Sequence, residues 1–171
     1  VITTRAQYVR KLAVGDFNND GFLDLASASS TDSMIRWYKN LGGKSFSKTP
    51  LVVERKALQA RWVTVGDFNG DGSLDLASAT WGVRNNKNSG RIAWYNNADG
   101  KGNCGQPIVV AQHHKVRCVQ AADVNNDGLL DIYVSVSGKT GNKQNQLYVN
   151  QGTNSEGIPE FIEKGEEFDI A

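Results

Sequence analysis

Short runs in which apolar and polar residues alternate recur along the whole chain, and the 3.6-residue spacing of an amphipathic helix is missing. The runs come in pairs separated by a polar loop. The first members are Leu12–Gly15, Val63–Gly66 and Cys118–Ala122, and the second members are Leu25–Ala28, Leu76–Ala79 and Ile132–Val136. A period of two predicts β-strands joined by turns, so the pattern predicts an all-β fold.

The strands belong to three similar units, whose loops align without gaps over Asp16–Leu25, Asp67–Leu76 and Asp123–Ile132. A third run follows each loop, at Ile35–Asn40, Ile92–Asn97 and Gln146–Asn150. A fourth follows at Pro50–Val53, Pro107–Val110 and Pro159–Ile162. Four strands that repeat about every fifty residues are typical of β-propeller blades.

The repeat also predicts where the units divide. We expect the last strand of a preceding blade at 1–4, blades at 5–54, 55–111 and 112–163, and an acidic tail or a connection to a next blade at 164–171. Propellers typically close with about four to eight blades. The prediction is therefore a β-propeller segment of about three four-stranded blades, part of a larger ring or assembly.

Each loop reads Asp-x-Asn-x-Asp-Gly-x-x-Asp, with side-chain oxygens at positions 1, 3, 5 and 9 and a backbone carbonyl available at position 7. Such hard donors suit Ca²⁺, whereas zinc favours His and Cys and magnesium needs stricter geometry. The loops differ from EF-hands, because strands flank them and Ser27, Ser78 and Val134 replace the glutamate of position 12. The sequence predicts calcium sites in β-hairpins.

With the Ile-x-Trp-Tyr-x-Asn strand, these loops resemble the FG-GAP/VCBS repeat family, which includes the calcium-binding blades of integrin alpha-subunit propellers. No Phe-Gly…Gly-Ala-Pro signature is present, so the VCBS variety is the closer match. The resemblance implies three Ca²⁺ sites. Their ligands would be Asp16, Asn18, Asp20, the Phe22 carbonyl and Asp24; Asp67, Asn69, Asp71, the Ser73 carbonyl and Asp75; and Asp123, Asn125, Asp127, the Leu129 carbonyl and Asp131.

The charge balance changes when those sites fill. The chain carries 19 basic and 18 acidic residues, a formal charge of +1, and nine of the acidic residues lie in the three loops. Bound calcium would leave a basic body that favours anionic partners, such as acidic glycans, lipid headgroups or an acidic protein face, unless the bases are scattered over the surface. The balance argues against a nucleic-acid partner. No apolar run approaches the length of about 18 residues that a membrane-spanning helix needs.

Several other residues invite interpretation. Trp37 and Trp94 occupy matching strand positions and are expected to pack between blades. Trp62 and Trp81, with the basic loops at 81–91 and 137–146, are candidates for a ligand or partner surface. His113 and His114 are expected to be polar connectors, and Cys104 and Cys118 form either a disulfide or two free thiols. No nucleophile–base constellation stands out in the sequence.

The sequence therefore predicts a calcium-stabilised, non-enzymatic protein-interaction or scaffold module, as a subunit of a larger assembly with one or more protein partners. One alternative is a lectin-like propeller that binds a glycan through the two basic loops. Another is an accessory domain of a larger secreted enzyme. The expected location is extracellular or a lumenal calcium-rich compartment.

Overall fold

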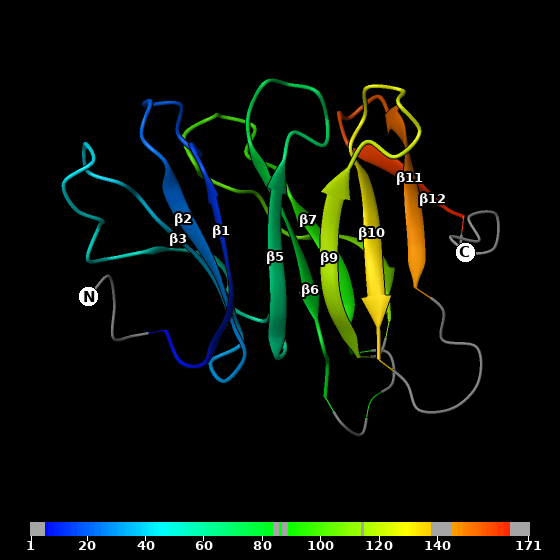
Figure 1. The fold of residues 1–171 in the computed structure, drawn as a ribbon, viewed down its shortest axis with the longest axis horizontal. Helices are drawn as coiled ribbons and strands as arrows, with labels where there is room; N and C mark the ends of the chain where they lie inside the picture. The colour runs from blue at the N-terminus through cyan, green and yellow to red at the C-terminus, as the bar shows by residue number, and fades with distance from the viewer. Residues whose placement is uncertain (1–5, 84–85, 87–88, 114, 138–144, 165–171) are drawn as a thin grey trace.

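The computed structural model describes residues 6–83, 86, 89–113, 115–137 and 145–164. The expected strand at 1–4, the segment 165–171 and parts of the two basic loops lie outside these residues. The described chain is all-β, with three antiparallel sheets of four strands and no helix (Figure 1), which confirms the predicted fold class. The three sheets do not close into a ring (Figure 1).

Each sheet contains four consecutive strands, paired in chain order. The first contains β1 (Val9–Gly15), β2 (Asp24–Ser29), β3 (Met34–Tyr38) and β4 (Leu51–Glu54). The second contains β5 (Ala60–Gly66), β6 (Asp75–Thr80), β7 (Arg91–Tyr95) and β8 (Ile108–Gln112). The third contains β9 (Val116–Ala122), β10 (Asp131–Val136), β11 (Gln146–Thr153) and β12 (Pro159–Glu163).

The strand registers repeat from sheet to sheet. The last residue of each first strand pairs with the last aspartate of the loop, as Gly15 with Asp24 in the first sheet, and as Gly66–Asp75 and Ala122–Asp131 in the others. Between the second and third strands, Ala26 faces Trp37 and Ala77 faces Trp94. The same side chains therefore point to the same side of every blade.

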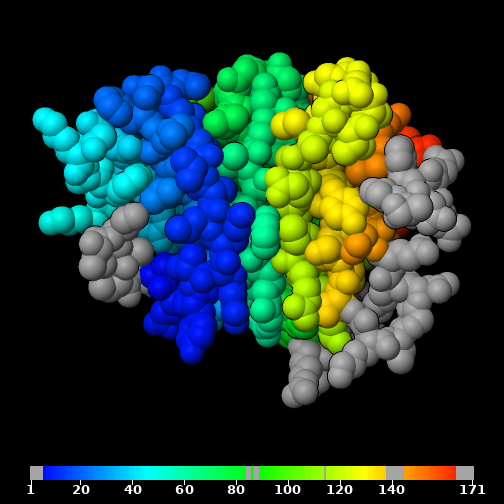
Figure 2. Space-filling model, viewed as in Figure 1, coloured from blue at the N-terminus to red at the C-terminus, as the bar shows by residue number. Residues whose placement is uncertain are grey.

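The blades stand side by side, with their first strands β1, β5 and β9 adjacent (Figure 1). In the space-filling view these strands form neighbouring blue, green and yellow-green strips across one face (Figure 2). The aspartate loops lie together at one end of the strands, and the second strand of each blade runs from its loop toward the other end (Figure 1). This arrangement gives the segment two chemically different ends.

The hydrophobic core lies between the blades. One cluster joins Phe17 and Trp37 of the first blade to Leu76 and Tyr95 of the second. The other joins Phe68, Ala77, Ile92 and Trp94 of the second blade to Val119, Ile132 and Tyr148 of the third. Trp37 and Trp94 are both buried, so the expected packing role is confirmed. Within the described residues, no helix is long and apolar enough to cross a bilayer.

Candidate metal centres

Each aspartate loop is a tight hairpin connection between the first and second strands of its blade. The glycine at position 6 has a left-handed backbone in all three loops, with φ of 83° at Gly21, 85° at Gly72 and 88° at Gly128. No atom lies within 4 Å of where a β-carbon would stand at these glycines, so it is the backbone conformation, and not space, that favours glycine there.

The carboxylate at position 1 organises the loop from within. Asp16 accepts backbone N–H groups from Asp20 at 3.1 Å and Gly21 at 2.7 Å. Asp67 accepts the corresponding bonds from Asp71 at 3.1 Å and Gly72 at 2.9 Å. Asp123 does the same in the third loop, from Asp127 at 3.2 Å and Gly128 at 2.9 Å. These N–H donors offset part of the repulsion among the loop carboxylates.

Positions 3 and 5 are linked to each other in the second and third loops. Asn69 Nδ2 donates to Asp71 Oδ2 at 2.8 Å, and the third loop repeats this bond between Asn125 and Asp127 at 2.8 Å. The first loop differs, because both Asn18 Nδ2 and Asn18 Oδ1 are buried without a hydrogen-bond partner among the described residues. Its position-5 carboxylate, Asp20, instead pairs with the Lys39 ammonium at 3.2 Å.

The carboxylate at position 9 is buried in the hairpin. Asp24, Asp75 and Asp131 are completely inaccessible to solvent. Asp75 Oδ1 accepts the Asn97 backbone N–H at 2.8 Å, while Oδ2 accepts the Trp94 Nε1–H at 3.0 Å and the Phe68 N–H at 3.3 Å. Asp24 and Asp131 accept the equivalent backbone bonds in their own blades. These aspartates therefore also hold three strands together.

Burial shifts the pKa of two of these carboxylates, Asp75 and Asp24. Burial raises the pKa of Asp75 to about 6. The hydrogen bonds from Asn97, Trp94 and Phe68 lower this pKa, but their effect is smaller than that of burial. Burial likewise raises the pKa of Asp24. For Asp20, desolvation is outweighed by the Phe22 N–H and by Lys39, so its pKa is lowered. A divalent cation beside the buried carboxylates would favour their ionised form.

The donor set fits a hard cation. Carboxylates at positions 1 and 5, an amide oxygen at position 3 and a carbonyl at position 7 are all oxygen ligands of the kind that Ca²⁺ binds. Among the described residues, however, no group of three or more Asp, Glu, His or Cys side chains converges on one point. The position-9 carboxylate is already engaged, although a carboxylate has about four lone-pair sites and can accept a further partner.

The other predicted site residues lie apart from the loops. The Arg61 guanidinium lies over the Trp81 ring, and the Lys11 ammonium lies over the Trp62 ring. His113 bonds to the Tyr148 hydroxyl, as a polar connector would, while His114 lies outside the described residues. Cys104 and Cys118 are free thiols.

The structure also assigns a role to an asparagine that ends the third-strand motif. Asn97 Nδ2 donates across the blade boundary to the Phe17 carbonyl at 2.8 Å, and Asn150 Nδ2 donates to the Phe68 carbonyl at 2.9 Å. Both side chains are fully buried. The signal in the sequence was the recurrence of asparagine two residues after tyrosine, but the repeat alone does not show that its partner is a carbonyl of the preceding blade.

Comparisons with known proteins agree with the repeat. No curated protein matches the chain. The family model described as FG-GAP-like repeat matches residues 10–78 and 79–134, most of the chain. The first match spans the aspartate loops that begin at Asp16 and Asp67, and the second match spans the loop that begins at Asp123. The chain belongs to the FG-GAP-like repeat family.

Proposed function

We propose that this chain is a calcium-stabilised β-propeller segment that serves as a non-enzymatic protein-interaction or scaffold module. The family and the fold support the coarser statement, a propeller-like interaction module. The observation that carries the calcium proposal is that the same oxygen-donor loop occurs three times, each time between the first and second strands of a blade. In the first blade this junction is closed by the pairing of Gly15 with Asp24.

Calcium would act here as a structural ion. It would neutralise the carboxylates at positions 1 and 5 and hold the hairpin that begins each blade, while the buried position-9 carboxylate ties that hairpin to the third strand. Because the core lies between blades, fixing each hairpin also fixes the packing of neighbouring blades. Sites that bind calcium with a Kd of about 10⁻⁴–10⁻³ M, as in extracellular modules, would fill in an extracellular or lumenal calcium-rich compartment, which is the location we propose.

A protein partner is favoured over a stacked sugar. A lectin-like site would need an open aromatic face, but Trp62 and Trp81 each carry a cation over the ring, at 4.3 Å and 4.5 Å from its centre. The non-enzymatic assignment rests on the family and on the loop aspartates, which are committed to hydrogen bonds within their hairpins.

Thermal unfolding with and without calcium tests the proposal. If Ca²⁺ binds only the folded chain, a concentration about 100 times Kd adds roughly 2.7 kcal/mol per site, and EDTA should lower Tm by several degrees. Mg²⁺ should restore much less, because it demands octahedral geometry and keeps its waters. Unfolding curves that superimpose in Ca²⁺ and in EDTA would contradict structural calcium.

A further inference from the structure

An arginine occupies the same place in every blade. Arg10, Arg61 and Arg117 each stand six residues before the first loop aspartate and are the second residues of β1, β5 and β9. These strands are adjacent and begin at the end opposite the aspartate loops (Figure 1). The three cations lie near one another there, since Arg10 and Arg117 both act electrostatically on Arg61, and Arg61 and Arg117 both lie over the Trp81 ring. At about 3.3 Å per residue, roughly 20 Å separates them from the candidate metal centres. We call these three residues the arginine cluster.

Each of these arginines is the extra residue of a β-bulge. Against the second strand, the pairing of β1 passes from Val9 to Lys11 and so skips Arg10. The pairing of β5 skips Arg61 in the same way, and that of β9 skips Arg117. A bulge redirects the side chain of the unpaired residue, and bulges are frequent beside functional sites. An ordinary surface arginine does not require one.

The backbone just before each arginine is also unusual. Tyr8, Gln59 and Lys115 each lie two residues before an arginine and have left-handed φ angles of 54°, 51° and 63°. The carbonyls of the same three residues accept the N–H of Ser30, Trp81 and Ser137, at 3.0, 3.2 and 3.0 Å. Left-handed backbone in residues other than glycine is strained, and the surrounding structure holds it here in all three blades.

Each arginine is held by the side chain that follows the second strand of its own blade. Arg10 Nε donates to Ser30 Oγ at 3.1 Å, and Arg117 Nη2 donates to Ser137 Oγ at 3.1 Å. At the equivalent position in the second blade, Trp81 lies 4.5 Å below the Arg61 guanidinium and also 5.2 Å from that of Arg117. The cluster is therefore positioned by specific contacts.

Within the part of the chain that the structure describes, no carboxylate pairs with the arginine cluster. Among the described residues, none of the three arginines forms an ion pair, whereas Arg36 and Arg91 each pair with a carboxylate. Arg61 Nε is buried and has no hydrogen-bond partner among the residues that the structure describes. Burial, and then repulsion from Arg10 and Arg117, lowers the pKa of Arg61. A bound anion would relieve this repulsion and supply the missing acceptor.

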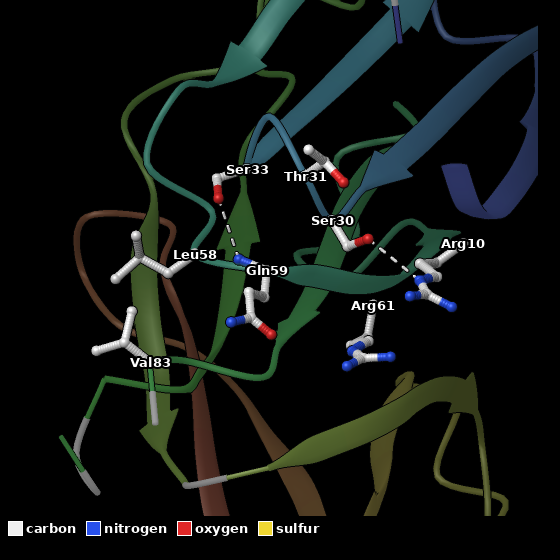
Figure 3. A pocket seen from close by; sticks show the side chains of 8 residues that line it. All are labelled: Arg10, Ser30, Thr31, Ser33, Leu58, Gln59, Arg61 and Val83. Atoms are coloured by element: carbon white, nitrogen blue, oxygen red, sulfur yellow. Dashed lines mark hydrogen bonds between the residues drawn. The ribbon is translucent and has the colours of Figure 1, made fainter. Parts of the chain in front are cut away.

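A cavity of about 450 Å³ adjoins the cluster. Arg10 and Arg61 lie on one side of it, and Leu58 and Val83 lie on the other, with Gln59 between them (Figure 3). The lining thus combines cations that suit carboxylates with two aliphatic side chains, of which Leu58 is 37% and Val83 39% exposed. This combination matches an acidic peptide that carries an apolar residue beside its carboxylates.

We propose that the arginine cluster and its cavity bind an acidic peptide segment of a protein partner. The guanidinium groups would donate hydrogen bonds to its carboxylates, and Leu58 and Val83 would contact an apolar side chain of the same segment. This inference rests on the proposed function as an interaction module and names the chemistry of the partner. The covered faces of Trp62 and Trp81 make a stacked acidic sugar the weaker candidate.

Fluorescence anisotropy of a labelled Glu-Glu-Leu-Glu-Glu peptide, measured with the whole chain in saturating Ca²⁺, tests the proposal. The peptide should bind, and the Gln-Gln-Leu-Gln-Gln peptide should not. Arg61→Gln should weaken binding about tenfold or more, because charge-assisted hydrogen bonds are lost. The matched control Arg55→Gln removes the same charge from an exposed site outside the cluster and should change affinity by less than about twofold.

Several results would overturn the inference. One is that Arg61→Gln and Arg55→Gln change the affinity for the acidic peptide equally. Another is that the uncharged peptide binds as tightly as the acidic one. A third is that a heparin tetrasaccharide binds in a way that depends on Arg61 while the acidic peptide does not bind. If circular dichroism shows that Arg61→Gln unfolds the chain, Arg10→Gln is tested in its place, because Arg10 is exposed. Arg10→Gln should also lower the affinity for the peptide, and an unchanged affinity would contradict the proposal.

Thermal unfolding of the same samples separates this inference from the proposed function. A retained calcium shift without peptide binding overturns the peptide site alone. Arg61-dependent peptide binding without any calcium shift overturns structural calcium alone.

Discussion

A terminal methyl group of Leu130 lies directly against Gly66 of the neighbouring blade, where a β-carbon on Gly66 would overlap it. The preceding boundary repeats this contact, with the Leu74 methyl 2.8 Å from the place where a β-carbon on Gly15 would stand. In both cases the glycine ends a first strand and the leucine precedes a buried aspartate. On the open side of the first blade, the equivalent Leu23 is 60% exposed. The absence of a side chain on the glycine thus sets how closely two blades approach.

Gly66→Ala should therefore lower the free energy of unfolding by about 1–2 kcal/mol, because the new methyl group overpacks against Leu130. This cost exceeds the stability that alanine adds by restricting the unfolded chain. The double variant with Leu130→Ala should lose less than the sum of the two single changes, because the overlap is gone. Urea unfolding measures this cycle. Gly105→Ala is the control, since the nearest atom to its added β-carbon is 3.8 Å away. Strictly additive effects would show that the contact does not limit blade packing.

Asn97 provides hydrogen bonds at the boundary between the first and second blades, where Leu74 lies against Gly15. Its side chain donates to the carbonyls of Phe17 and Leu74 and accepts the Gly102 N–H at 2.7 Å. Asn97→Ala leaves these buried groups without partners and should cost about 2–4 kcal/mol. Asn40→Ala, at the same position of the first blade, breaks only bonds within its own blade and leaves groups that water can reach, so it should cost about 1 kcal/mol. Equal losses in denaturant unfolding would contradict an inter-blade role for Asn97.

Much of this architecture could be predicted from the sequence, because the periodicity and the spacing of three similar units are local signals. The same holds for the left-handed glycine of each loop and for the packing of Trp37 and Trp94. Contacts across a boundary were harder to foresee. The recurrence of Asn97 and Asn150 does not name the carbonyls they bond, and a bulge at Arg61 depends on which residues pair across two strands. Such features need three-dimensional register.

The first aspartate loop should bind calcium more weakly than the other two. Lys39 holds the Asp20 carboxylate at 3.2 Å, whereas Asn96 and Val149 stand at that position in the other blades. With the other loops disabled by Asp71→Asn and Asp127→Asn, Lys39→Asn should tighten calcium binding about two- to fivefold, the energy of an exposed ion pair. Calorimetric titration measures the affinity. The control is Lys44→Asn, because Lys44 is exposed and lies outside the loop. This change should leave the calcium affinity unchanged. If it raises the affinity as much as Lys39→Asn does, net charge alone explains the increase.

The two thiols should differ in reactivity. Burial, reinforced by the charges of Asp75 and Asp99, raises the pKa of Cys104 to about 12, so almost no thiolate exists at pH 8. Burial also raises the pKa of Cys118, but nearby Lys11 opposes that rise. A chromogenic disulfide reagent should label Cys118 of the native chain faster than Cys104. The Cys104→Ser variant measures the rate at Cys118 alone, and Cys118→Ser measures the rate at Cys104 alone. Faster labelling of Cys104 would contradict the rise of its pKa, and no labelling before reduction would indicate a disulfide.

The most direct test of the central claim is the number of calcium ions bound by the folded chain, counted by equilibrium dialysis against ⁴⁵Ca²⁺. The three loops predict three ions per chain, falling to two in Asp71→Asn and remaining three in the control Asp99→Asn, whose exposed carboxylate lies outside the loops. Binding of no calcium by the folded chain, or the same number in Asp71→Asn as in the unaltered protein, would contradict the account.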